Sequence, residues 1–165
     1  MPDAVTLLKE DHRKVEDLFK QFEEAKGDGR KRKIAEQIAA ELIVHTQIEE
    51  EIFYPACEGK VEDADIKEAY VEHDAAKVLV AEIIAGGPDD DYYESKVHVL
   101  QEEIEHHVKD EERWLTGVFS QAKRHGVDMD KLGDELAARK ADLMGGIEKN
   151  GLPEIKLSTM EDVKV

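Results

Sequence analysis

The feature that most constrains this chain is a pair of matching four-residue steps, His45 to Glu49 and His107 to Glu111. Each step lies within a run of apolar residues spaced three or four apart, which is typical of an amphipathic helix. Residues four apart lie on one face of a helix, about one turn apart along its axis. Each step therefore points an imidazole and a carboxylate at the same place, and the apolar neighbours predict that this place is inside the protein.

Glycine and proline residues divide the rest of the chain into further segments with the same helical period. The connections between them are short, so neighbouring helices should run antiparallel. No segment alternates in the way a strand would. The expected long helices cover residues 3–26, 30–54, 63–85 and 90–124, and a shorter one covers residues 129–144.

The pattern therefore predicts an all-α protein, an antiparallel up-down four-helix bundle with an accessory C-terminal helix. We expect residues 1–125 to form the bundle and residues 126–165 to form the accessory helix and a tail of the same domain. The histidine–glutamate pair of the fourth helix lies far from that helix's expected end. This helix must therefore overhang the others or end early.

Charge and composition limit the partners. The net charge of −17 speaks against nucleic acid and against an anionic membrane surface. No apolar stretch approaches the roughly 20 residues that span a bilayer, and residues 1–14 do not resemble a secretory signal. The one cysteine cannot form an internal disulfide, which favours a reducing compartment. We expect a cytoplasmic protein, and its oligomeric state is left open.

Each of the four long helices has one histidine on its apolar face. A single such histidine is more often an ordinary core residue than a ligand, and one histidine–glutamate pair can be a local ion pair. Four histidines together with two matching pairs favour metal binding instead. The remaining histidines, His98, His106 and His125, fall among charged residues or at a helix end.

Two ionised glutamates in one core need cations, because an unpaired buried carboxylate costs several kcal/mol. Four imidazoles and two carboxylates suit a pair of first-row metal ions with the carboxylates bridging, and this mixture suits iron. The absence of a thiolate disfavours structural zinc. The predicted metal ligands, called the six inner residues below, are His12, His45, Glu49, His73, His107 and Glu111.

Five other residues lie near these positions in the sequence or could contribute to such a site. Glu41 lies one turn before the second-helix histidine and could orient it, but we expect it on the surface. Tyr54 is an additional candidate, as a hydrogen-bonding group or extra ligand, although ideal helix geometry turns it away from the metals. Trp114 should lie in the core, Glu72 should be solvated, and Cys57 should be an inert or surface thiol.

The order and spacing of the six inner residues resemble the hemerythrin-like, HHE cation-binding family. The segment 45–55, His-Thr-Gln-Ile-Glu-Glu-Glu-Ile-Phe-Tyr-Pro, resembles the second-helix signature of that family. Glu72-His73-Asp74 resembles its third-helix signature. The resemblance covers residues 4–119 and implies two non-haem iron ions, bridged by both inner glutamates and by an oxo or hydroxo group.

The resemblance also implies how the ligands divide. His12 and His45 would serve one iron, and His73 and His107 the other. The oxygen carriers of the family have a further histidine where this chain has Lys77. One iron is therefore short of a protein ligand, which water or a residue such as the tyrosine at 54 would have to complete. This departure disfavours simple reversible oxygen carriage.

Three functions were considered. The first is chemistry on a small oxygen species, with catalase-like decomposition of hydrogen peroxide, and whether the protein is an enzyme is left open. The second is reversible binding or sensing of oxygen, nitric oxide or iron without turnover. A ferritin-type site would need Glu-x-x-His on two helices, and only Glu103 with His106 has that spacing, on a face predicted to be solvated.

Overall fold

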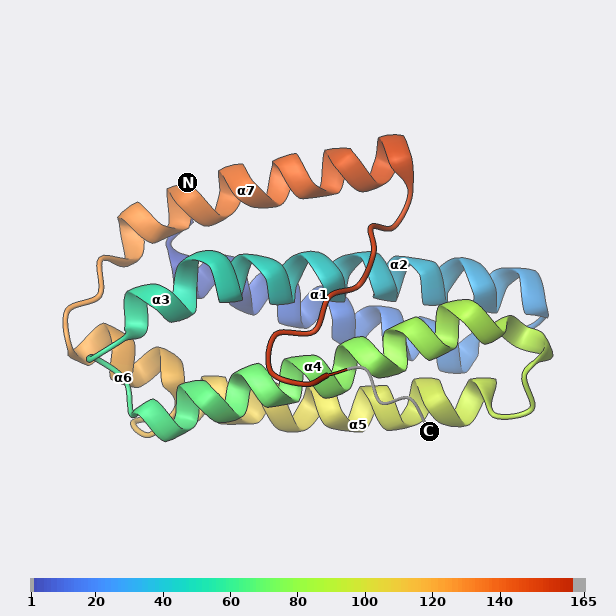
Figure 1. Ribbon diagram of the computed structural model, residues 1–165, viewed down its shortest axis with the longest axis horizontal. Coiled ribbons are helices and arrows are strands. Elements are labelled where there is room, and N and C mark those ends of the chain that lie inside the picture. Colours follow the sequence, from blue (N-terminus) through green and yellow to red (C-terminus); the bar gives the residue numbers. More distant parts are fainter. Residues whose placement is uncertain (1, 162–165) are drawn as a thin grey trace.

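The computed structural model describes residues 2–161 and is helical throughout its regular part (Figure 1). No strand occurs among these residues, so the all-α prediction is confirmed. The elements are α1 (Ala4–Glu24), α2 (Asp28–Ile48), a π-helical turn η1 (Glu49–Phe53), α3 (Tyr54–Cys57), α4 (Asp63–Gly86), a 3-10 turn η2 (Gly87–Asp89), α5 (Tyr93–Glu112), α6 (Val118–Arg124) and α7 (Met129–Asn150).

Helices α1, α2, α4 and α5 form the expected antiparallel up-down bundle (Figure 1). Each of them contacts the next, and α5 closes the ring against α1. The accessory helix α7 lies over α1 and α2. After α7, residues 151–161 run without regular structure across α2 to the side of α4 (Figure 1). No helix within residues 2–161 combines the length and the apolar character needed to cross a bilayer.

The helix ends follow local rules. The Asp3 carboxylate accepts a hydrogen bond from the backbone N–H of Thr6 at 2.8 Å, which caps α1. Asp128 does the same for α7, accepting from the N–H of Lys131 at 3.1 Å. Gly27 precedes α2 with a φ of +87°, a conformation that glycine adopts without strain.

The second long helix does not end at Tyr54. It continues from α2 through η1 into α3, where the N–H of Tyr54 bonds to the carbonyl of Glu49, five residues back. Pro55 follows directly. Its ring would crowd the carbonyl four residues before it in a regular α-helix, and the widened turn accommodates it.

The fourth long helix ends early, which is one of the two outcomes expected from the sequence; it does not overhang the other helices. Helix α5 stops at Glu112, and residues 113–117 form a break before α6. Gly117 is the last residue of this break, and it must be small because a Cβ there would lie 2.5 Å from the carbonyl oxygen of Arg113. The prediction that Trp114 lies in the core is wrong: it leaves the helix in this break and is 81% exposed.

The core consists of two apolar clusters with a polar layer between them. One cluster is built around Leu8, Phe53 and Phe119. The other lies nearer the opposite end of the bundle and includes Phe19 and Leu100. Four of the six inner residues lie on α1, α4 and α5, and the other two lie on α2 and η1. All six are buried, and on α1 and α4 they come between the two apolar clusters.

Candidate metal centre

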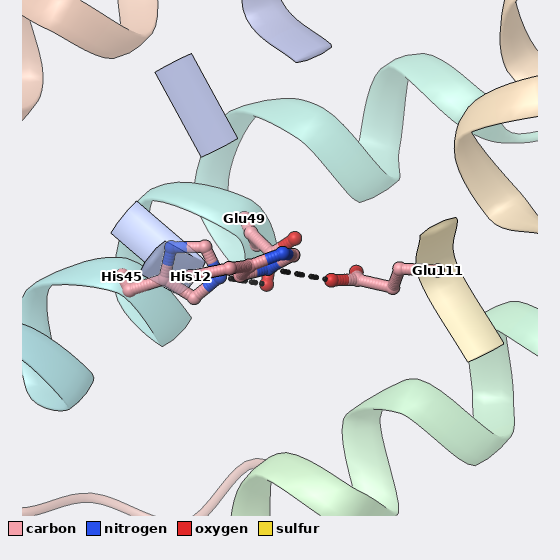
Figure 2. A group of neighbouring side chains, drawn as sticks. All are labelled: His12, His45, Glu49 and Glu111. Atoms are coloured by element: carbon pink, nitrogen blue, oxygen red, sulfur yellow. Dashed lines mark ion pairs between the residues drawn. The ribbon is translucent and has the colours of Figure 1, made fainter. Parts of the chain in front are cut away.

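The structure brings all six inner residues together and buries each of them. One group of mutually close ligand atoms comes from His12, His45, Glu49 and Glu111, and a second comes from Glu49, His73 and His107. Within each group the atoms lie within 4.8 Å of one another. Figure 2 shows Glu111 pointing toward the cluster formed by the other three members of the first group. Glu49 belongs to both groups, so the two groups adjoin.

Each inner glutamate lies between imidazoles from two different helices. All four histidines present the same ring atom, Nε2, to the centre. The distances from Nε2 to the nearer carboxylate oxygen are 3.0 Å for His45 and 3.2 Å for His73, both to Glu49, and 3.2 Å for His12 and 3.4 Å for His107, both to Glu111.

Several atoms of the cluster have no hydrogen-bond partner within residues 2–161 although they are buried. They are His12 Nε2, His45 Nε2, Glu49 Oε2 and Glu111 Oε1. His12 Nε2 and His45 Nε2 each lie 3.0–3.2 Å from a carboxylate oxygen without forming a hydrogen bond to it. Several buried polar atoms without hydrogen bonds in one place are unusual in a native core. All four are atoms of the kind that ligate metals, and the residues therefore fit a bound cation.

Tyr54 lies at the middle of this cluster. Its hydroxyl donates to Glu111 Oε2 at 2.6 Å, and it lies 3.2 Å from Glu49 Oε1 and 3.2 Å from His73 Nε2. The expectation that it points away from Glu49 is wrong. In a regular α-helix a step of five residues would turn it by about 140° from Glu49, but the π-helical turn adds a residue and returns it to the same face. The proline after the tyrosine is the signal in the sequence.

The second nitrogen of each inner histidine is also occupied. In every case Nδ1 bonds to a carboxylate from a neighbouring helix. We call these four residues the outer carboxylates. The pairs are His12 with Glu112 (2.6 Å), His45 with Asp11 (2.9 Å), His73 with Glu50 (2.9 Å) and His107 with Glu72 (2.8 Å).

The outer carboxylates form a closed ring around the bundle. Each is the direct sequence neighbour of an inner residue on its own helix but bonds to the histidine of another helix. Asp11 of α1 reaches α2, Glu50 of η1 reaches α4, Glu72 of α4 reaches α5, and Glu112 of α5 returns to α1. A carboxylate on Nδ1 fixes the ring orientation and leaves Nε2 free to ligate, as in many metal sites.

Sequence reasoning missed these partners or misplaced them. Glu41 is buried rather than on the surface, and it pairs with Lys14 at 2.6 Å, while His45 bonds to Asp11 instead. Glu72 is half-buried against His107 rather than solvated. The sequence does contain a signal for them. Each outer carboxylate is next to an inner residue in the sequence, so it is turned by about 100° around the helix and faces the neighbouring helix.

In the metal-free protein, shifted pKa values favour protonated imidazoles beside ionised glutamates. Burial alone would lower the pKa of His45, but the carboxylates of Glu49 and Asp11 outweigh burial and raise it to about 10. Burial raises the pKa of Glu49, but the adjoining histidines overcome it and hold the pKa well below its usual range. Ring protons therefore offset the carboxylate charge, and a metal ion would displace them.

Two other residues were expected from the sequence not to be ligands, and the structure shows where they lie. Lys77, at the place of the further histidine, extends to Glu50, with Nζ 2.9 Å from its carboxylate. Cys57 is fully buried, so it is not a surface thiol. Burial, with Glu49 and Glu111 nearby, raises the pKa of this thiol to about 12, which leaves it inert.

A cavity lies beside the cluster. It has a volume of about 340 Å³ and lies along α4 and α5. Its lining includes the inner residues His107 and Glu111 and the exposed residues Glu68 and His106. A small molecule could reach the inner residues from this side.

Comparison with known proteins agrees with these observations. The chain is 28% identical over 109 residues to a protein of Nostoc sp. named DNA nickase, covering 66% of this chain but only 31% of that protein. The chain thus spans about a third of that relative's length. It is 25% identical over 144 residues to the uncharacterized protein Rv2633c of Mycobacterium tuberculosis, covering 87% and 88% of the two chains.

The fold also matches a solved structure. A crystal structure of a hemerythrin HHE cation binding domain-containing protein from Mycobacterium kansasii superposes with a TM-score of 0.77, covering 92% of this chain and 96% of that one, at 23% identity. The model of the hemerythrin HHE cation binding domain matches residues 3–119, which contain all six inner residues. The chain therefore belongs to the hemerythrin HHE cation-binding family, with a buried histidine–glutamate cluster that could hold metal.

Proposed function

We propose that this protein binds two iron ions through the six inner residues and decomposes hydrogen peroxide. The observation that carries the proposal is the convergence of four Nε2 atoms on two buried glutamates, of which Glu49 belongs to both groups of ligand atoms. A set of four imidazoles and two carboxylates suits iron. His12 and His45 would hold one ion, His73 and His107 the other, with both glutamates between them.

Tyr54 is proposed as a further participant. Its hydroxyl lies 3.2 Å from His73 Nε2 and 3.4 Å from His107 Nε2, on the side of the group whose further histidine is replaced by Lys77. Burial, together with Glu111 and Glu49, raises the pKa of this phenol well above its usual value. The phenol therefore keeps its proton in the metal-free protein and donates a hydrogen bond to Glu111.

Two adjacent irons, when bound, supply the two electrons exchanged when two hydrogen peroxide molecules become two waters and one oxygen molecule. The chain contributes the surroundings of that exchange. The outer carboxylates fix the four imidazoles, which keeps the ligand set rigid. Tyr54 holds a proton beside Glu111, and the cavity along α4 and α5 admits a small molecule.

The test is oxygen evolution from peroxide by protein loaded with ferrous iron, with the iron content measured on the same sample. We expect two irons per chain and oxygen release that is lost in His45→Ala. His98→Ala is the matched control. His98 has the same spacing to a glutamate, Glu102, four positions later on α5, but both side chains are exposed and lie away from the cluster. Protein that holds two irons but releases no oxygen would exclude peroxide decomposition and leave reversible binding or sensing of oxygen or nitric oxide.

Nucleic acid is not part of the proposed function. The relative named DNA nickase is matched over only 31% of its length. The net charge of −17 offers little to neutralise phosphates. We expect no binding of duplex DNA at physiological salt, and retention of labelled DNA in a gel-shift assay would contradict this.

A further inference from the structure

Each outer carboxylate also contacts a basic side chain, and these basic side chains come from different parts of the chain. The pairs are Glu112 with Arg13, Glu50 with Lys77, Glu72 with His106, and Asp11 with Lys140. The first three basic residues belong to helices of the bundle. Lys140 comes from α7, beyond the part of the chain that the family model matches.

Lys140 reaches the metal centre through one intermediate. Its Nζ bonds to Asp11 Oδ1, while Asp11 Oδ2 accepts from His45 Nδ1 at 2.9 Å. Asp11 is buried between them. A buried carboxylate needs a positive partner, and Lys140 supplies one for Asp11.

The tail after α7 is anchored next to another inner histidine. Asp74, the residue after His73, is buried and accepts four hydrogen bonds from the tail. Three come from the backbone N–H groups of Ser158 (2.9 Å), Thr159 (2.6 Å) and Met160 (2.8 Å), and the fourth comes from the Thr159 hydroxyl (2.6 Å). This anchor fixes residues 158–160 against α4, after the preceding part of the tail has crossed α2 (Figure 1).

The anchored tail then contacts an outer carboxylate. The hydroxyl of Ser158 donates to Glu50 Oε1, and Glu50 Oε2 bonds to His73 Nδ1 at 2.9 Å. The path from Ser158 through Glu50 to His73 therefore has the same form as the path from Lys140 to His45. One path ends at each of the two proposed iron positions.

We infer that the C-terminal segment, residues 129–161, forms an outer part of the metal centre, in which Lys140 and Ser158 are positioning residues for His45 and His73. The inference rests on the proposed metal site but not on peroxide as its substrate. The family match ends at residue 119, so the segment would distinguish the centre of this chain from one built by the matched region alone.

The test uses the full chain with Lys140→Met and Ser158→Ala, and reads the histidine rings by ¹⁵N NMR in the metal-free protein. We expect Lys140→Met to shift the ring signals of His45, and Ser158→Ala to shift those of His73. Lys140→Arg and Ser158→Thr, which keep the charge and the hydroxyl, should restore them. Lys149→Met on the exposed part of α7 is the control and should move neither ring.

The second measurement is iron affinity, from competition between the protein and a chromophoric ferrous chelator. Weakened outer partners reduce metal affinity by about 10–100-fold in other sites, and we expect about tenfold in each variant, with a shifted absorption band of the iron-loaded protein. Ring signals and affinity equal to those of the unmodified protein and of Lys149→Met would overturn the inference. Unmodified protein that binds no iron would overturn the proposed function, while the metal-free NMR still decides whether the segment positions the rings.

Discussion

Tyr54 donates its phenolic hydrogen to Glu111 across the centre of the bundle at 2.6 Å, although the two residues lie 57 positions apart. This bond joins the π-helical turn to α5 inside the layer of inner residues. It exists because the turn after Glu49 contains one residue more than an α-helical turn would. The tyrosine thereby lies among the inner residues instead of outside the bundle.

Tyr54→Phe tests this bond, because it keeps the ring in the core and removes only the hydroxyl. Glu111 Oε2 would lose a close donor, which should cost about 1–3 kcal/mol of unfolding free energy in the metal-free protein. We expect a lower melting temperature, a changed absorption spectrum after iron loading and at least tenfold slower peroxide decomposition. Tyr70→Phe is the control, since within residues 2–161 the Tyr70 hydroxyl bonds only to the backbone carbonyl of Glu50. An unchanged absorption spectrum of iron-loaded Tyr54→Phe would contradict a role of the Tyr54 hydroxyl at the metal centre.

Glu49→Gln tests the sharing of this carboxylate between the two groups of ligand atoms. The amide keeps the size of the side chain but removes its charge, so neither group retains its full donor set. Iron content, measured by elemental analysis after desalting, should fall from two ions per chain to below one. His73→Ala removes a ligand of one group only and should leave about one ion. Two tightly held ions in Glu49→Gln would rule out the shared position.

Asp11→Asn tests the ring of outer carboxylates. The carboxylate accepts from His45 Nδ1 at 2.9 Å, and its loss should weaken iron binding by about 10–100-fold without removing a ligand. Affinity is measured by competition with a ferrous chelator. Asp17→Asn is the matched control on the same helix, because Asp17 is exposed and its carboxylate accepts a hydrogen bond from Gln21, away from the cluster. Equal affinities in the two variants would show that the ring does not act on the metal.

The stability of the metal-free protein should depend on pH through His45. Its pKa rises from 6.5 in the unfolded chain to about 10 in the folded protein, because Glu49 and Asp11 outweigh the effect of burial. The stabilisation is therefore complete below pH 6.5 and is lost as the pH rises through 10. Each kcal/mol lost lowers the melting temperature of a domain of this size by about 2–4 °C.

Thermal unfolding at pH 6.5 and at pH 10 checks this dependence. The metal-free protein should melt at a lower temperature at pH 10 than at pH 6.5. The iron-loaded protein should melt higher at both pH values, since a ligand that binds only the folded state stabilises it. A metal-free melting temperature that rises between pH 6.5 and 10 would contradict the assignment of the raised pKa to His45.

Gly117→Ala tests the break that ends α5 next to the centre. A Cβ at this position would lie 2.5 Å from the carbonyl oxygen of Arg113 and 2.6 Å from that of Glu111, both of them backbone atoms that cannot turn aside. We expect destabilisation by about 1–3 kcal/mol, as for other overpacked sites, together with weaker iron binding through the displaced Glu111. Gly145→Ala in α7 has open space around it and should be neutral or slightly stabilising. Denaturant titration of both variants gives the comparison.

The sequence by itself determined the helices and the layer of polar residues within them. The spacing of apolar residues is a local property, so the periods around Leu8, Ile38 and Leu100 are enough to predict helices and their buried faces. The histidines and glutamates on those faces were identified for the same reason, and the structure buries all six together. Their role as iron ligands stays a prediction.

Only the tertiary structure decided which groups surround that layer. Tyr54 points inward because a π-helical turn changes the register, and Trp114 points outward because the chain leaves α5 before it. The periodicity of one helix cannot show that Asp11 faces His45 on the next, or that the tail bonds to Asp74. Such contacts depend on how the helices pack and where irregular chain crosses them, and neither leaves a repeating pattern in the sequence.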